Sequence, residues 1–319
     1  MSDFLGAHSN EVRRAAERIR PHVRRTPTLT TDLDPLLRLK AECFQVTGSF
    51  KPRGAFNAVL SLMDHERPRG VIAVSSGNHA QAVALAARTV GVPALILIPE
   101  DANPAKVAAT RALGAEVIQE GITFANREER MREEMAERGY TLVHPFDDWN
   151  VIHGQGTAVL EMLQDAPDLE VVVTPVGGGG LLSGSAIAGH SHNASMKVIG
   201  VEPEQADDAY RSWKSGSIQA LATSPTTLAD GVRTTHIGER NFEVMIANRL
   251  VDSIVTVTEE EIATAVRVAW TRLRLALEPT GTLPLAAHLA GKLPGGRTGL
   301  VLSGGNANFQ TVARLLDTA

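Results

Sequence analysis

Three short turns could bind an anion, and each follows a predicted strand. They are Ser75–His79, Gly177–Gly180 and Ser303–Asn306. Ligands of open parallel sheets bind at the carboxyl ends of the strands, which is where turns of this kind lie. We therefore expect the three turns to meet at one binding site.

The four consecutive glycines of the second turn predict a phosphate site. Glycine lets a ligand come close to the backbone, and the helix that follows begins with free N–H groups. A tight turn without a ligand gives little reason for such a run. No frame completes the dinucleotide fingerprint, and Gly184 is followed by Ser185 instead of the lysine of a nucleotide-binding P-loop.

The first turn reads Ser75-Ser76-Gly77-Asn78-His79. Its hydroxyls, its amide and the N–H groups of a helix start suit a carboxylate. Serine and asparagine are also the usual residues at the N-cap of a helix, so a capped helix without a ligand explains the same pattern equally well.

Lys51 could form a Schiff base with an aldehyde if its amine is deprotonated and held in place. Phe50 precedes it and Pro52 follows, which places the lysine at a loop-to-helix junction with a restricted backbone. Because most lysines are solvated, this residue alone is a weak signal.

An acidic segment follows a predicted strand, with four carboxylates within the seven residues 202–208. Hard oxygen ligands of this kind suit Mg²⁺ or Ca²⁺. The alternative is an acidic surface loop, and the residues by themselves favour that interpretation.

The bulk properties exclude several classes of protein. The chain has 319 residues, 43% of them hydrophobic, with a net charge of −5. This balance gives no basic excess for nucleic acid, and no apolar stretch is long enough to span a membrane or serve as a signal peptide. A single cysteine, Cys43, permits no intramolecular disulfide. We expect a cytoplasmic protein.

The pattern of elements predicts an α/β protein, because short apolar strands alternate with helices, which implies parallel sheets. Expected strands cover 37–44, 71–74, 93–98, 116–119, 141–143, 170–174, 197–201 and 299–302. After a first helix that carries early arginines on its solvated face, expected helices cover 53–63, 79–90, 104–113, 126–139, 157–163, 181–189 and 259–277. The segment 216–235, rich in Ser, Thr, Pro and Gly, is expected to be a loop.

These motifs, in this order, resemble the fold-type II enzymes that use pyridoxal 5′-phosphate (PLP), specifically the serine/threonine dehydratase (threonine ammonia-lyase) and serine racemase family. The resemblance covers nearly the whole chain, and its most specific part is the run 47–55 around Lys51. It implies a tryptophan synthase β-like fold with two open parallel-sheet α/β domains. A large PLP-binding domain (1–67 and 140–319) would have a small domain (68–139) inserted in it, and the chain would form a homodimer or homotetramer.

The resemblance also implies a role for individual residues. Lys51 matches the Schiff-base lysine, which would later act as general base. Other cofactor contacts match Phe50 and Asn78 at the ring and its oxygen, Ser303 at the pyridine nitrogen, and Gly177, Gly178, Gly179, Gly180 and Leu181 around the phosphate. The loop that holds the substrate carboxylate matches Ser75, Ser76, Asn78 and His79. The divalent-cation site of many members, for Mg²⁺ or else Ca²⁺ or Mn²⁺, matches Glu202, the carbonyl of Ala206 and Asp208. This last match reverses the preference for an acidic surface loop.

The implied activity is the conversion of a small hydroxy amino acid, L-threonine or L-serine, to a 2-keto acid and ammonia. Ser76 matches the serine that returns a proton in racemases, so serine racemase is an alternative, as is a 3-hydroxyaspartate dehydratase. Phe146 and Ala80 are more typical of dehydratases than of animal racemases. From other classes, a non-catalytic relative that senses a phosphorylated metabolite would not need Lys51, and cysteine synthases lack the acidic segment. Two departures from the family are a short segment between Thr30 and Leu37 and Val46 in place of a common lysine.

Overall fold

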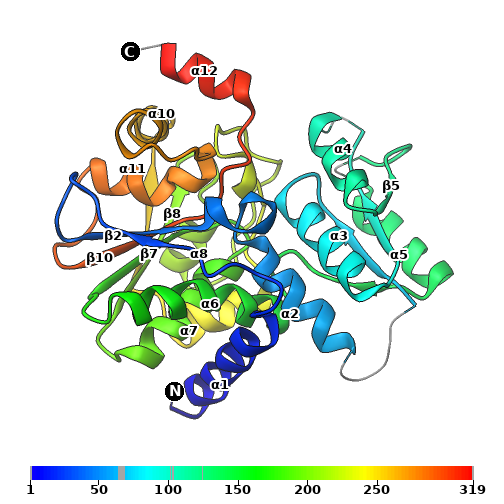
Figure 1. The fold of residues 1–319 in the computed structure, drawn as a ribbon, viewed down its shortest axis with the longest axis horizontal. Helices are drawn as coiled ribbons and strands as arrows, with labels where there is room; N and C mark the ends of the chain where they lie inside the picture. Colours follow the sequence, from blue (N-terminus) through cyan, green and yellow to red (C-terminus); the bar gives the residue numbers. More distant parts are fainter. Residues whose placement is uncertain (1, 64–68, 101, 103, 124, 318–319) are drawn as a thin grey trace.

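The computed structural model describes residues 2–63, 69–100, 102, 104–123 and 125–317, and they form two sheets with helices on both faces (Figure 1). The larger sheet has the strand order β1-β2-β10-β7-β8-β9 and is parallel except for β1, which runs antiparallel to β2. Its strands are β1 (Thr28–Leu29), β2 (Leu37–Ala41), β7 (Val171–Pro175), β8 (Lys197–Pro203), β9 (Ser253–Val257) and β10 (Thr298–Leu302).

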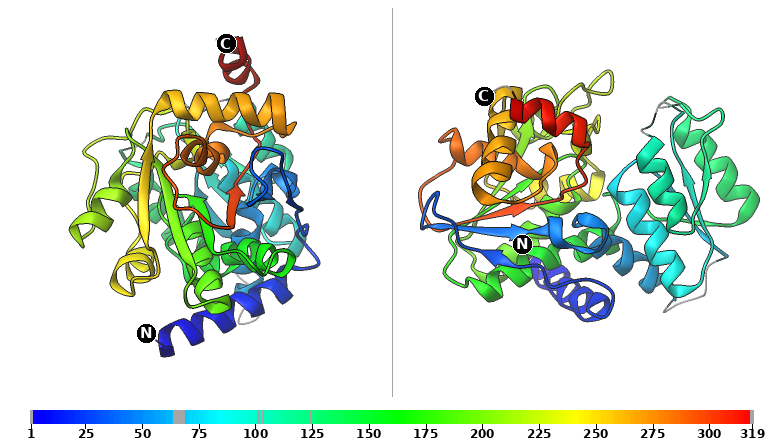
Figure 2. Two further views of the ribbon diagram at one scale, coloured as in Figure 1. Left: turned by 90° about the vertical axis from the view of Figure 1, so that its left-hand side faces the viewer. Right: turned by 45° about the horizontal axis from the view of Figure 1, so that its top comes forward.

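The smaller sheet is parallel throughout, with the order β5-β4-β3-β6. Its strands are β3 (Val71–Val74), β4 (Ala94–Leu97), β5 (Glu116–Ile118) and β6 (Thr141–Leu142). The helices of the chain are α1 (Ser2–Ile19), α2 (Lys51–Met63), α3 (Asn78–Val90), α4 (Pro104–Ala112), α5 (Arg127–Arg138), α6 (Trp149–Asp165), α7 (Gly180–His192), α8 (Asp208–Ser215), α9 (Glu239–Phe242), α10 (Glu259–Val268), α11 (Leu283–Leu289) and α12 (Phe309–Asp317). Figure 2 shows the smaller sheet and its helices standing beside the larger layer.

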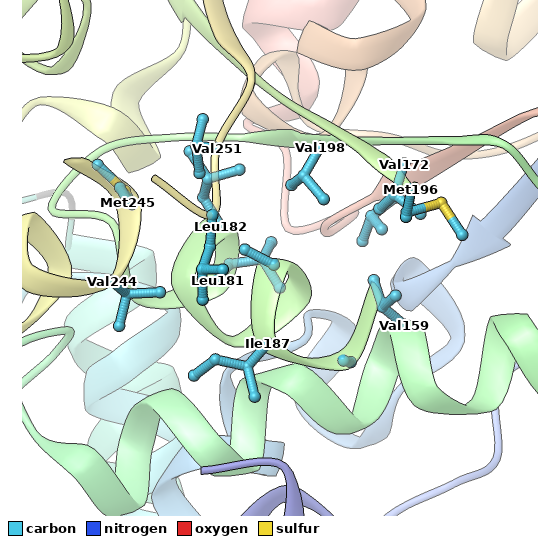
Figure 3. Packing of buried hydrophobic residues seen from close by; sticks show 14 of the residues in the cluster. Val159, Val172, Leu181, Leu182, Ile187, Met196, Val198, Val244, Met245 and Val251 are labelled. Atoms are coloured by element: carbon cyan, nitrogen blue, oxygen red, sulfur yellow. The ribbon is translucent and has the colours of Figure 1, made fainter. Parts of the chain in front are cut away.

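The central strands of both sheets are buried on both faces, which explains their continuous apolar sequences. In β7, Val172 packs with α6 and α7 on one face, while Val171 and Val173 pack with α10 and α11 on the other. Figure 3 shows the first of these cores, where Ile187 of α7 lies near Val159 of α6 below the strands. Each fully buried valine or isoleucine stabilises the fold by about 1.5–3 kcal/mol.

Helix α2 joins the two layers, because it packs against α6 of the larger layer and α3 of the smaller one. Its close contact with α6 depends on Gly154, where an added Cβ would collide with the Arg53 carbonyl oxygen. Gly156 and Gly184 allow a similar backbone contact between α6 and α7, with an added Cβ on Gly184 only 2.5 Å from the Gly156 nitrogen. Lys51, the first residue of α2, is thus placed at the junction of the layers.

These glycines also explain an error of prediction. A helix was expected only over 157–163, yet α6 begins at Trp149, where the Asp148 side chain caps it by accepting from the Asn150 and Val151 amides. Glycine disfavours an isolated helix by about 1 kcal/mol. Here the loss is offset by packing against α2 and α7, which a local pattern does not reveal.

Other predicted boundaries also need correction. The strand expected over 37–44 ends at Ala41, and a 3₁₀ turn covers Glu42–Phe44. The helix expected over 259–277 is α-helical only to Val268 and continues as a π-helical turn to Leu273. The expected elements did not include strands β1 and β9 or helices α8, α9, α11 and α12. The segment 216–235 is a loop apart from a 3₁₀ turn, η3 (Asp230–Val232).

The division into domains remains a proposal. Its first expected boundary, at 67–68, lies outside the described residues, and β6 lies just past the second boundary at 139–140. Among the described helices, none is both long enough and apolar enough to cross a membrane.

Candidate active site

The structure brings the predicted cofactor and substrate residues to one cavity of about 970 Å³ between the two layers. Its wall includes Phe50 and Lys51, the turn Ser75–His79, the run Gly177–Leu181, and Ser303. Strands β3, β7 and β10 each end at this wall, so turns far apart in sequence meet here.

Lys51 and Ser303 are brought together by a short backbone pairing. Ser49 forms an antiparallel bridge with Gly304, and the Phe50 amide donates to the Ser303 carbonyl at 3.0 Å. The chain then turns into α2, whose first residue is Lys51. The segment before the lysine is therefore fixed to the end of β10.

The Lys51 amine is desolvated by the surrounding protein, and this lowers its pKa to about 8. Nζ donates to the Pro145 carbonyl oxygen at 2.9 Å and lies 5.1 Å from the centre of the Phe50 ring. Within the described residues, no carboxylate forms an ion pair with it. A neutral amine, the form that attacks a carbonyl or removes a proton, is thus accessible near neutral pH.

The glycine run Gly177–Gly180 begins α7, and Gly179 is its N-cap with φ +102°, a conformation that favours glycine. No side chain in the described part of the protein caps this helix start. Part of the space that these glycines leave open is filled by another side chain of the protein. An added Cβ on Gly178 would collide with the Phe146 ring. Packing thus accounts for part of the run, while the uncapped amides remain suited to a phosphate.

The turn Ser75–His79 leads from β3 into α3. The His79 Nε2 lies 2.8 Å from the Val143 carbonyl oxygen and must donate to it, and burial lowers the pKa of this histidine to about 3. His79 is therefore neutral, and its Nδ1 is a buried acceptor without a hydrogen-bond partner among the described residues. The Ser75 and Ser76 side chains are half-buried and line the cavity.

These groups fit pyridoxal phosphate. The desolvated amine of Lys51 suits its aldehyde, the uncapped start of α7 suits its phosphate, and the buried Ser303 lines the same wall for its ring nitrogen. Phe50 and Asn78 line the same cavity. The assignment of each residue follows the sequence resemblance, and all of these residues line the cavity.

The predicted cation ligands lie away from this cavity, on β8 and the start of α8. Glu202 and Asp208 are fully buried, and burial raises the pKa of both, to about 7 for Asp208. Glu202 accepts from the Ala209 and Tyr210 amides, but both oxygens of Asp208 lack a partner within the described residues. This unpaired carboxylate fits a cation. No set of three or more His, Cys, Asp or Glu residues in the described ranges is arranged to hold a metal, so a site here would also need the Ala206 carbonyl and water.

Several residues of the cavity were not found from the sequence. Glu278 is buried in its wall and accepts from the Asn78 side chain, 200 positions away in the sequence. Lys106 of α4 pairs with Asp230 of η3 at 2.5 Å, and both line the cavity. Arg127 also lines it, and burial lowers its pKa. No local motif marks Glu278 or Lys106, because the partners of both are distant in sequence.

Comparison with known proteins agrees with this geometry. A family model described as "Pyridoxal-phosphate dependent enzyme" matches residues 19–304. The L-threo-3-hydroxyaspartate ammonia-lyase of Saccharomyces cerevisiae is 44% identical over 95% of this chain and 94% of its own length. The serine racemase of Schizosaccharomyces pombe is 41% identical over 99% of both chains. The solved structure of a T.th. threonine deaminase is 50% identical, with a TM-score of 0.89 over 94% of this chain and 98% of that one.

Proposed function

Because the chain belongs to the family of pyridoxal-phosphate dependent enzymes, we propose that it is an ammonia-lyase acting on L-threonine, L-serine or both. The products would be a 2-keto acid and ammonia. The observation that carries the proposal is Lys51, whose desolvated amine faces a cavity that also holds an uncapped helix start. The likeness to a threonine deaminase supports the choice of reaction.

Each group of this chain has a task in the proposed reaction. Pyridoxal phosphate, when bound, draws electrons from the substrate Cα. The Lys51 amine removes the Cα proton and would pass it to the β-hydroxyl, which leaves as water. Hydrolysis of the remaining enamine then gives the 2-keto acid and ammonia. The start of α3 holds the substrate carboxylate through its amides and the hydroxyls of Ser75 and Ser76. Ser303 would hold the ring nitrogen as a neutral partner that does not fully protonate it, which would favour rapid loss of the β-hydroxyl.

Hydroxyaspartate is a second candidate substrate. Arg127, from α5 of the smaller layer, lines the cavity, where a second carboxylate would meet its positive charge. The similarity to the yeast hydroxyaspartate ammonia-lyase supports this candidate. Racemisation is the third, because Ser76 lines the cavity and could return a proton to Cα.

Three further assignments rest on the sequence and stay proposals. We propose that Glu202, Asp208 and the Ala206 carbonyl bind a divalent cation, that the chain assembles as a homodimer or homotetramer, and that it acts in the cytoplasm.

The test is release of 2-keto acid by PLP-loaded protein with Mg²⁺, with L-threonine, L-serine and L-threo-3-hydroxyaspartate compared side by side. Rapid release from threonine or serine is the expected result. Release from hydroxyaspartate alone would move the enzyme to the second candidate. Absence of keto acid from all three, with PLP bound, would contradict a lyase and leave racemisation, measured by chiral separation of serine.

A further inference from the structure

Glu278 is a carboxyl buried at the cavity wall for which the proposed reaction has no task. It is 3% exposed and stands between the ends of the two sheets. Its Oε1 accepts from Nδ2 of Asn78 at 2.7 Å, and an added Cβ on Gly304 would stand 2.5 Å from the same oxygen. A carboxylate and the residue that begins α3 are thus held against the loop after β10.

A chain of hydrogen bonds fixes which end of the Asn78 amide faces which neighbour. The Thr47 carbonyl can only accept, so Asn306 turns its Nδ2 towards it, at 2.6 Å. The same Nδ2 donates to Oδ1 of Asn78 at 2.8 Å. Asn78 therefore turns its own Nδ2 towards Glu278, an acceptor, and this atom keeps a second N–H that Glu278 does not use.

The backbone is strained at Thr47, where this series of hydrogen bonds ends, and this strain is a second observation that points to a specific arrangement. Thr47 has φ +62°, which is rare for a β-branched residue. Gly48 follows at φ +74°, and an added Cβ there would stand 2.5 Å from Oδ1 of Asn306. Strain of this kind persists when the surrounding contacts require it. Here the strained turn directs the Thr47 carbonyl at Asn306, and this contact fixes the donor and acceptor ends of the two asparagine amides.

We propose that Glu278 is a positioning residue, which holds the Asn78 amide with one N–H directed at the cofactor and ties the start of α3 to the loop after β10. This rests on the proposed function, because Asn78 is taken as a contact of the cofactor oxygen. Glu278 reaches the cofactor only through Asn78. A charged carboxylate holds the amide more firmly than a neutral one.

The ionisation of Glu278 falls in the working range of pH. Burial raises its pKa to about 7, and the charge of Asp230 adds to this, while the Asn78 donor and Lys106 lower it. The group is protonated below this pKa and charged above it. Affinity for the cofactor is therefore expected to rise as pH increases through about 7.

The test uses Glu278→Gln and Glu278→Leu in the full chain, with folding checked by circular dichroism. Glutamine keeps an acceptor oxygen but cannot ionise, so cofactor affinity should stay within about tenfold of the wild type and lose the part of its pH dependence that lies near 7, while the rise caused by deprotonation of Lys51 near pH 8 remains. Leucine removes the acceptor, and both cofactor affinity and kcat should fall about 10- to 100-fold. A Leu variant with unchanged cofactor affinity would overturn the proposal.

A double-mutant cycle with Asn78→Ala separates positioning from a general structural effect. If Glu278 acts through Asn78, the leucine change should cause no further loss in the alanine background. An equal loss in both backgrounds would overturn the proposal. Cofactor affinity keeps this test independent of the reaction, because wild-type protein that binds PLP but releases no keto acid would refute the proposed function alone.

Discussion

At the scale of single residues, environment rather than residue type makes Lys51 chemically unusual. An exposed lysine is protonated at neutral pH, but desolvation beside Phe50 and Pro145 lowers the pKa of this amine to about 8. The sequence indicated the lysine through its neighbours in the motif. It did not indicate the Pro145 carbonyl, which lies 94 positions away.

The lowered pKa predicts how the apoprotein takes up its cofactor. Only the neutral amine reacts with the aldehyde, so the rate of PLP incorporation should rise about tenfold per pH unit up to about pH 8 and then level off. The rate can be followed by the absorbance of the bound cofactor. A rate that is still rising near pH 10 would show a lysine solvated as in water.

At the scale of elements, the contact of α6 with α2 places Lys51, the proposed Schiff-base lysine. Gly154→Ala should push the first turn of α2 away, since the new Cβ would meet the Arg53 carbonyl. Overpacking of this kind costs about 1–3 kcal/mol. We expect a lower Tm and a lower kcat, measured by thermal unfolding and keto acid release.

The matched control is Gly6→Ala in α1, where an added Cβ has open space around it. This change should leave kcat unaltered and raise stability slightly, by about 0.5–1 kcal/mol, through helix propensity. Equal effects of the two substitutions on kcat would contradict the role given to the α2–α6 contact.

A second prediction concerns the ion pair between α4 and η3. Lys106 and Asp230 both line the cavity and are partly exposed, so the pair contributes about 0–1 kcal/mol at most. Lys106→Ala should leave Tm unchanged and raise KM by up to about fivefold at low salt, less at high salt. Lys214→Ala on α8 is the control. An equal rise in KM for that variant would show that the Lys106–Asp230 ion pair has no specific effect on substrate binding.

At the scale of the whole molecule, the sequence predicted the features that depend on residues close together in the chain. The alternation of strands and helices, the three turns and Lys51 were readable because each depends on neighbours in the chain. The α6 start at Trp149 was missed because glycines inside a helix make sense only beside α2 and α7. Glu278 was missed because nothing in its local sequence marks it. Its contact with Asn78 is formed only when the chain folds.

Whole-molecule stability should respond to divalent cations through Glu202 and Asp208. Two buried carboxylates, one of them without a partner among the described groups, are costly unless a cation neutralises them. Mg²⁺ or Ca²⁺ at about 100 times its Kd should add about 2.7 kcal/mol, seen as a higher Tm that EDTA reverses.

Asp208→Asn should abolish this gain, whereas Glu204→Gln, at an exposed neighbour on the same segment, should keep it. A cation effect that survives Asp208→Asn would place the ion elsewhere on the protein.

The most direct test of the central claim is the rate of 2-keto acid release from L-threonine or L-serine by Lys51→Ala, measured beside the wild type. PLP retained by each protein is quantified in the same samples. We predict that the variant keeps its fold and loses at least about 10³-fold of the rate, because its general base and its attachment point for the cofactor are removed together. Keto acid release at the wild-type rate by the variant would contradict the account.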